Sequence, residues 1–275
     1  MAITAADVMK LRKATGAGMM DCKKALTDAN GDFDGAVQII REKGKLVASK
    51  RSDREASEGV ALAKVSDDNK FGAIVVLNCE TDFVAKNDDF VKKTASFVDV
   101  ALTGKPADLE GLKGLDVDGR TVADHVTEQT GVIGEKIELG HFASVESEYV
   151  IGYIHPGNKL ATLVGFNKAG FDAQVAKDVA MQVAAMNPVA VDKDAVSQEV
   201  IDKELEIAKE KFRQEGKPEA MLDKIAQGSL NKFFKESTLL NQAFVKDNKQ
   251  TVKDYLTSVD KDLTVTAFQR FALSE

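Results

Sequence analysis

Apolar positions follow a helical spacing in the first part of the chain and a mixed pattern in the rest. In residues 1–54 they recur every three or four positions, and the turn sequences TGAG at 15–18 and NGD at 30–32 interrupt them. A charged stretch, KRSDREASEG at 50–59, comes next. We therefore predict a small head of three short helices followed by a linker.

A β-hairpin pattern occurs twice in the remainder of the chain. The run VALAKVSDDNKFGAIVVLN ends at Asn78, and VIGYIHPGNKLATLVGFN ends at Asn167. Each run has two β-rich stretches joined by a turn, and Asn69 in the first turn matches Asn158 in the second. The body is therefore expected to consist of two related units, each opening with a hairpin.

A helical pattern follows each hairpin. The apolar stripe of the first helix is Phe90, Thr94, Phe97, Val98 and Ala101, and that of the second is Val175, Val179, Val183 and Met186. The hairpins match at an offset of 89 residues but the helices at 85, so the first unit has four additional residues between hairpin and helix. Those residues fall in the sequence TDFV, at 81–84.

The ends of the two units also resemble each other. HFASVE closes the first unit at Glu146, and RFALSE closes the second at Glu275, 129 residues later. The second unit therefore holds about 44 residues that the first lacks, and the charged stretch at about 192–236 supplies them. This stretch predicts two antiparallel helices that reverse at Gly216–Lys217–Pro218, because glycine commonly ends a helix and proline commonly begins one.

Together these patterns predict an α+β protein in three parts. The parts are a helical head at 1–54, a first core subdomain at 55–146, and a second core subdomain at 147–275 that contains the inserted helical hairpin. Each core subdomain is expected to be an antiparallel sheet with helices on one face.

Charge is distributed unevenly between head and body. The net charge is −7, yet residues 1–54 carry eleven Lys and Arg against seven Asp and Glu, which leaves −11 on the remainder. A basic head suggests an acidic surface as its target, either nucleic acid or an acidic face of a protein. An ordinary solvated distribution of charge is the alternative.

The sequence contains no recognisable catalytic, metal or cofactor motif. His125, His141 and His155 occur singly, without the spacing of metal ligands, and no glycine-rich phosphate loop follows a strand. Cys22 and Cys79 are far apart and are expected to be reduced thiols. No apolar run is long enough to span a membrane, and the first residues do not resemble a signal peptide. We therefore expect a cytoplasmic protein that is not an enzyme.

Two stretches resemble the signature sequences of bacterial elongation factor Ts. They are TGAGMMDCKKAL at 15–26 and TDFVAKN at 81–87, and the segment QAFV at 242–245 extends the resemblance over nearly the whole chain. The resemblance implies a nucleotide exchange factor for elongation factor Tu, the GTPase that carries aminoacyl-tRNA to the ribosome. It also implies that the head is a ubiquitin-associated-like domain that docks on the partner's nucleotide-binding domain.

The resemblance also implies which residues contact elongation factor Tu. They are Arg12, Met19, Met20 and Lys23 in the head, Thr81, Asp82, Phe83 and Val84 in the TDFV turn, His155 in the second hairpin turn, and Phe244 and Val245 near the end of the chain. Ala243 and Lys246 stand where the family often has proline and methionine. Some members of the family self-associate through the helical hairpin.

Phe83 has two possible roles. It lies seven residues before Phe90, nearly two helical turns, which favours packing on the core. The second unit, however, is predicted to fold without TDFV, so the scaffold does not require these residues. Together with the resemblance, this favours a probe that inserts into the partner.

Two other classes of function fit the sequence less well. A nucleic-acid-binding protein would use the basic head, but the charge of −11 on the body opposes it. A small-molecule enzyme on an α+β core would need a polar cluster that the sequence does not reveal.

Overall fold

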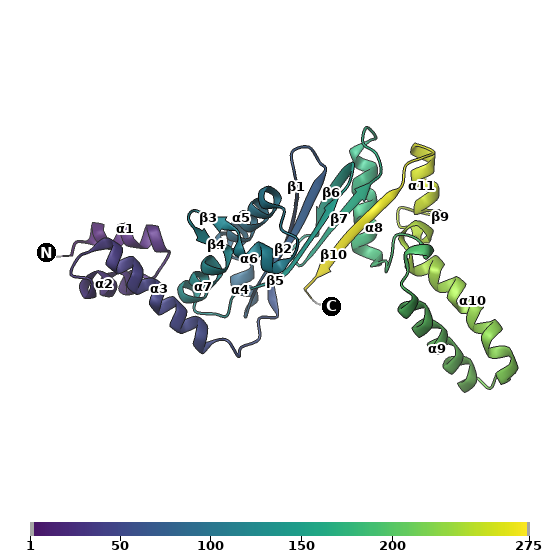
Figure 1. Cartoon of the computed structure of the whole chain (residues 1–275), viewed down its shortest axis with the longest axis horizontal. Helices are drawn as coiled ribbons and strands as arrows, with labels where there is room; N and C mark the ends of the chain where they lie inside the picture. Colours follow the sequence, from purple (N-terminus) through teal and green to yellow (C-terminus); the bar gives the residue numbers. More distant parts are fainter. Residues whose placement is uncertain (1–2, 274–275) are drawn as a thin grey trace.

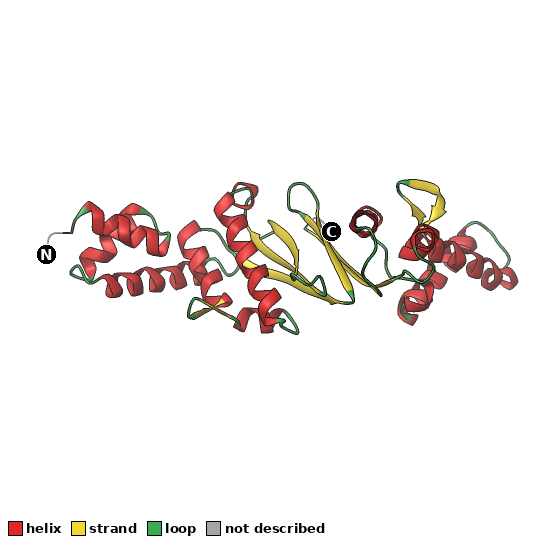
Figure 2. Ribbon diagram, turned by 90° about the horizontal axis from the view of Figure 1, so that it is seen from above, coloured by secondary structure: helices red, strands yellow, loops and turns green. Residues whose placement is uncertain are grey.

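The molecule is an elongated α+β protein. The computed structural model describes residues 3–273. Three helices form one end, two antiparallel sheets occupy the middle, and a pair of long helices projects at the other end (Figure 1). Seen from above, the strands of the two three-stranded sheets are gathered in the middle of the molecule, with helices and two short strand pairs toward the ends (Figure 2).

The head consists of α1 (Ala5–Thr15), α2 (Met19–Asp28) and α3 (Phe33–Lys50). Thr4 caps α1 in a reciprocal arrangement with Asp7, and Gly16 ends the helix in the left-handed conformation. The linker is shorter than predicted, because α3 continues to Lys50 and β1 begins at Glu58. The apolar face of α3 continues beyond the head and packs on a helix of the body, so this part of the chain stays helical.

The first sheet has the strand order β1-β2-β5. Its strands are β1 (Glu58–Val65), β2 (Phe71–Cys79) and β5 (Glu138–Glu146). The connecting elements are α4 (Asp82–Ala85), α5 (Asp88–Gly104), α6 (Leu109–Gly114), β3 (Asp116–Val117), β4 (Arg120–Thr121) and α7 (Val122–Ile133). The predicted stripe of α5 is buried against the sheet along its whole length.

The second sheet has the order β10-β7-β6. Its strands are β6 (Tyr149–Ile154), β7 (Leu160–Phe166) and β10 (Val265–Ala272), and α8 (Ala173–Met186) packs on it. The remaining elements are η1 (Lys193–Ala195), η2 (Leu239–Asn241), β8 (Ala243–Phe244), β9 (Asp247–Thr251) and α11 (Val252–Val259). Met186 does not belong to the buried stripe of α8, since it lies in the last turn and is 44% exposed.

The long helices that project from the second unit are α9 (Gln198–Gln214) and α10 (Glu219–Ser237). Ser197 caps α9, and the chain reverses at Gly216, whose φ is positive, before Pro218 precedes α10. The buried side chains of the pair are Ala208, Leu222, Ala226 and Leu230. They pack between the two helices rather than in the core of the second sheet.

The two sheets face each other across a small apolar layer, which includes Ile74, Val76 and Leu163. Backbone hydrogen bonds join the hairpins reciprocally. The Ala61 N–H donates to the Asn158 carbonyl at 2.7 Å, and the Val150 N–H donates to the Asn69 carbonyl at 2.6 Å. Each hairpin turn is therefore fixed against the first strand of the other unit.

The sequence match between HFASVE and RFALSE is wrong by three residues. Glu146 pairs with Phe71, and in the corresponding place of the second sheet Ala272 pairs with Leu160, so the closing strands match at an offset of 126 rather than 129. An odd shift turns every side chain of a strand to the opposite face, so burial rather than letter identity fixes the register.

Candidate protein-binding surface

The turn that contains TDFV forms one turn of helix, α4, which begins at Asp82. Thr81 caps it, with its Oγ1 accepting from the Val84 N–H at 3.4 Å. Asn87 then caps α5 by accepting from the Asp89 N–H at 2.8 Å. Two successive caps separate α4 from α5, so helical spacing does not carry over from one to the other.

Phe83 is 84% exposed. Its neighbours face inward, since Ala85 is buried and Val84 packs against the core of the first sheet. The structure therefore excludes core packing of Phe83 in this chain. The seven-residue spacing to Phe90 failed as a guide because the helical break lies between the two residues.

Asp82 lies beside Phe83 on α4. Its carboxylate pairs with Lys86 Nζ at 2.6 Å, one helical turn away. The hydrogen bond from Lys86 holds the pKa of Asp82 below its ordinary value. Asp82 is therefore a carboxylate at neutral pH, placed next to an exposed aromatic ring.

His155 is exposed in the β6–β7 turn, where the Tyr153 hydroxyl lies 3.0 Å from its Nδ1. Lys159 in the same turn pairs with Glu58 at 2.7 Å, and Glu58 pairs in the sheet with Cys79, shortly before α4. The fold thus brings the turn that carries His155 to the end of the first sheet from which α4 emerges.

The head residues implied by the resemblance lie around the turn between α1 and α2. Arg12 and Lys23 are exposed, and Met19 and Met20 are 40% and 75% exposed, so neither methionine is a core residue. Gly16 in this turn and Val84 of α4 line the same cleft, of about 460 Å³. The structure therefore brings the head turn and α4 to one cleft.

Phe244 is buried, unlike the exposed residues expected to contact a partner. Its side chain is 3% exposed and stacks on Tyr255, with ring centroids 4.2 Å apart and planes 15° from parallel. The ring is therefore unavailable to a partner, whereas Val245 is 46% exposed. Both residues lie in the second unit, at the end of β8 and directly after it.

Thr81 has a structural role within the chain, and one residue that supports α4 was missed. The Thr81 hydroxyl donates to Glu135 at 2.7 Å while its oxygen caps α4, so the side chain serves the chain's own structure. Glu135 lies just after α7, 54 residues along the sequence from Thr81. No spacing motif connects the two, so only the fold could identify Glu135.

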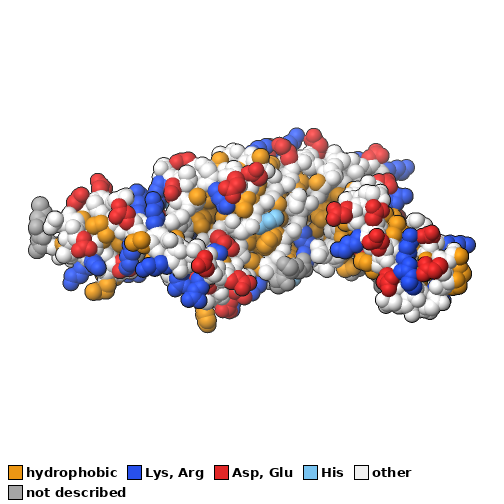
Figure 3. Space-filling view, turned by 60° about the horizontal axis from the view of Figure 1, so that its bottom comes forward, with side chains coloured by type: hydrophobic (Ala, Val, Ile, Leu, Met, Phe, Trp, Pro, Cys, Tyr) orange, Lys and Arg blue, Asp and Glu red, His pale blue; other side chains and the backbone are white. Residues whose placement is uncertain are grey.

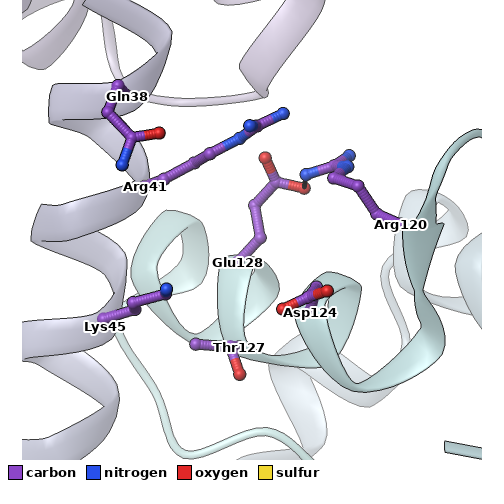
Figure 4. Close-up of a pocket in the computed structure, with 7 residues that line it drawn as sticks. All are labelled: Gln38, Arg41, Lys45, Arg120, Asp124, Thr127 and Glu128. Atoms are coloured by element: carbon purple, nitrogen blue, oxygen red, sulfur yellow. Dashed lines mark hydrogen bonds and ion pairs between the residues drawn. The ribbon is translucent and has the colours of Figure 1, made fainter. Parts of the chain in front are cut away.

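A second groove lies between α3 and α7 and has a volume of about 190 Å³ (Figure 4). Gln38, Arg41 and Lys45 line it from α3, and Arg120, Asp124, Thr127 and Glu128 line it from the opposite side. Arg120 is paired with Glu128 at 3.0 Å, and cations and carboxylates nearly balance. This groove is therefore a polar surface at the edge of the contact between the head and the body.

Residues 3–273 lack the features of several other function classes. In that range, no group of three or more His, Cys, Asp or Glu side chains could hold a metal ion, and none of the helices has the length and apolarity to cross a membrane. Burial raises the pKa of the Cys79 thiol to about 12, which suppresses its nucleophilic form. On the face shown in Figure 3, basic and acidic side chains are interspersed, unlike the continuous basic track that nucleic acid binding uses.

Comparisons with known proteins give a consistent result. The family described as Elongation factor TS matches residues 80–275. The chain is 59% identical to elongation factor Ts of Christiangramia forsetii, over 98% of each protein. It is 55% identical to elongation factor Ts of Porphyromonas gingivalis, over 100% of this chain and 99% of the relative. It is 50% identical to elongation factor Ts of Cytophaga hutchinsonii, over 99% of each.

Proposed function

The chain belongs to the elongation factor Ts family, and from this premise we propose that it is a nucleotide exchange factor for the GTPase elongation factor Tu. It binds the GDP-bound GTPase in the cytoplasm and promotes GDP release by disturbing the magnesium and phosphate site of the partner. No covalent bond is made or broken in this reaction, so the protein is not an enzyme in the usual sense.

The exposed ring of Phe83 is the observation that carries the proposal. An aromatic side chain that is 84% exposed on a capped helical turn contributes little to the stability of its own chain. Large aromatic side chains of this kind are typical of the few residues that dominate a protein interface. Phe83 is therefore proposed as the wedge that enters the partner, and Asp82 as a charge beside it.

The other contacts follow from the same surface. Arg12, Met19, Met20 and Lys23 are proposed to dock the head, and His155 to contact the partner near Phe83. Thr81 and Val84 are assigned a supporting role, because their side chains are used within the chain. Val245 is proposed as a separate contact from the second unit, held in place by the buried ring of Phe244.

The proposed domains are those of the sequence analysis, with a ubiquitin-associated-like head and two related core subdomains. The α9–α10 hairpin exposes Ile207 and Met221, at 52% and 50%. A second copy of the hairpin is the proposed partner of that surface.

Exchange by such a factor is a matter of linkage. Binding of the factor weakens nucleotide binding to the GTPase, and nucleotide weakens binding of the factor by the same coupling free energy. Each ~1.4 kcal/mol of coupling changes nucleotide affinity about tenfold. Magnesium demands near-ideal octahedral geometry, so a small displacement of its ligands by a wedge is sufficient to weaken GDP binding.

The test is release of fluorescent GDP from elongation factor Tu. The wild-type protein is expected to accelerate release, and Phe83→Ala to reduce that acceleration by about tenfold or more, as for an interface residue worth ~2 kcal/mol. Leu46→Ala is the matched control, because Leu46 is also an exposed apolar residue, at 63%, but lies on α3. A wild-type protein without effect on release, or a fully active Phe83→Ala variant, would contradict the proposal.

A further inference from the structure

Glu135 holds the base of α4 through three hydrogen bonds. It lies directly after Gly134, the left-handed residue that ends α7. Its Oε2 accepts from the N–H groups of Glu80 and Thr81, at 3.2 and 3.1 Å, and its Oε1 accepts from the Thr81 hydroxyl at 2.7 Å. Both carboxylate oxygens are therefore directed at the two residues that precede α4.

Glu80 in turn binds the segment that contains Glu135. Its carboxylate accepts from the Lys136 N–H and receives two bonds from Arg51 Nη1, at 2.8 and 3.0 Å. These donors hold the pKa of Glu80 below its ordinary value, with the Lys136 N–H as the largest cause. Arg51 directly follows α3, so the end of the head is joined to the same point.

A helix of one turn cannot maintain its own orientation. Four residues form too few internal hydrogen bonds to offset the entropy of ordering them, so α4 depends on contacts with the rest of the protein. Its apolar contacts are those of Ala85 and Val84, on the inward side. The charge-assisted hydrogen bonds that the Glu135 carboxylate accepts fix the N-terminal end of α4, at its capping residue Thr81.

We propose that Glu135 is a positioning residue for nucleotide exchange, because its carboxylate sets the direction in which α4 presents Phe83 and Asp82. This inference rests on the proposed function. Glu135 acts through α4 and needs no contact with the partner. The carboxylate is suited to the role since its two oxygens accept all three bonds, whereas a glutamine amide in its place offers one acceptor oxygen.

Cys79 provides a readout of α4 that does not involve the partner. Its thiol is buried and lies 3.2 Å from the Thr81 carbonyl, to which it donates. The experiment uses the full chain with Cys22→Ala, so that Cys79 is the single thiol, and measures its reaction with a disulfide reagent. Loosening of the Glu80–Thr81 segment exposes this thiol and speeds the reaction. Because the charge of Glu135 also raises the pKa of Cys79, labelling rates are compared after correction for the thiolate fraction of each variant.

In this background, Glu135→Ala is expected to raise the labelling rate of Cys79 about tenfold and to lower stimulated GDP release by a similar factor, since bonds to a charged acceptor are lost. Glu135→Gln, which keeps one acceptor oxygen, should lie between Glu135→Ala and the wild type in both measurements. It also remains informative if Glu135→Ala folds poorly. Glu138→Ala is the matched control, because the Glu138 carboxylate pairs with Lys136 Nζ at 3.1 Å and is expected to leave α4 in place.

A double variant separates positioning from general stability. If Glu135 acts through α4, adding Glu135→Ala to Phe83→Ala should reduce GDP release little further, because the wedge is already absent. The inference would be overturned if the losses of GDP release in the double variant were additive. It would also be overturned if Glu135→Ala left the labelling rate of Cys79 unchanged, or raised that rate without reducing GDP release. A wild-type protein that fails to stimulate release would instead refute the proposed function, while the labelling rates still show whether Glu135 holds α4.

Discussion

The backbone of Gly131 in α7 lies against the backbone of Gly44 in α3, so closely that a methyl group at Gly131 would overlap the Gly44 Cα. The crossing is asymmetric, because a methyl group at Gly44 would lie 3.7 Å from the Gly131 Cα, an ordinary contact. Close helix packing at this point holds the head against the body, in addition to the linker.

Alanine at these two positions should therefore have opposite effects. Gly131→Ala forces α3 away from α7 and is expected to release the head. Gly44→Ala should be neutral or stabilising, by up to about 1 kcal/mol, because alanine favours the helix. Trypsin cleavage at Arg51 and Arg54 in the linker measures the effect, and it should accelerate only in Gly131→Ala. Equal cleavage of the two variants would show that the crossing does not hold the head.

Phe83→Ala should leave the free energy of unfolding within about 0.5 kcal/mol of the wild type, because the ring is exposed. Phe97→Ala is the matched control. Phe97 is fully buried under the first sheet, and its truncation should cost ~3–5 kcal/mol. Denaturant titrations of both variants make the comparison. A large loss in Phe83→Ala would mean that the ring packs on the chain after all.

The α9–α10 hairpin should be dispensable for folding. Its base is held by backbone bonds outside the long helices, from Leu239 to the Ala190 carbonyl and from Leu240 to the Val191 carbonyl, both at 2.9 Å. Replacing 198–236 with a short Gly–Ser loop retains these bonds and should leave the melting temperature of the body within a few degrees. The mass of the particle in solution, measured on the same variant, tests the proposed self-association. A markedly lower melting temperature would show that the hairpin supports the second sheet.

The attachment of α4 should weaken in acid. Because the folded-state pKa of Glu80 is lowered, its contribution to stability is present above the ordinary glutamate value of ~4.3 and is lost as pH falls through the lower folded value. The charges of Arg51 and Arg54 act on this carboxylate, and the Glu135 carboxylate accepts from the backbone N–H of Glu80. The protection of the Lys136 amide against hydrogen exchange, relative to its intrinsic rate at each pH, should therefore fall in that range. Glu80→Gln should abolish this step, and an unchanged acid profile in that variant would assign the effect to another group.

The sequence patterns correctly predicted the structural elements that depend on local periodicity. The hairpins, the helices that cover them and the reversal at Gly216 are each encoded within a few neighbouring residues, and each is present. The register of the closing strands was wrong because it depends on which face the sheet buries. Whether a site residue is exposed also depends on the three-dimensional structure, as Phe83 and Phe244 show. Exposure of Phe83 follows from the break before α5, and burial of Phe244 follows from stacking on Tyr255 in a different element.

Asp178 should fix the position of the segment that carries Val245. The carboxylate is 6% exposed and accepts from Lys246 Nζ and Gln174 Nε2, both at 2.6 Å, and from the Tyr255 hydroxyl at 3.2 Å. Asp178→Ala leaves these donors without their acceptor and is expected to cost about 1–3 kcal/mol. Asp260→Ala is the control, because its pair with Lys168 is more exposed, with 43% of the Asp260 side chain accessible, and should be worth less than about 1 kcal/mol.

The tyrosine titration of the same protein gives an independent check. Burial, followed by the charge of Asp178, raises the pKa of Tyr255 to about 12. Asp178→Asn removes the smaller cause and keeps the larger, so the pKa of Tyr255 should fall only part of the way toward the ordinary value of ~10. Ultraviolet absorbance from pH 9 to 12.5 follows this titration, with Tyr255→Phe identifying the signal among the three tyrosines. A fall of the Tyr255 pKa to the ordinary value would mean that the substitution has opened the segment around Lys246 to water. In that case hydrogen exchange at the Val245 amide, which donates to Gln182 at 2.8 Å, should also be faster.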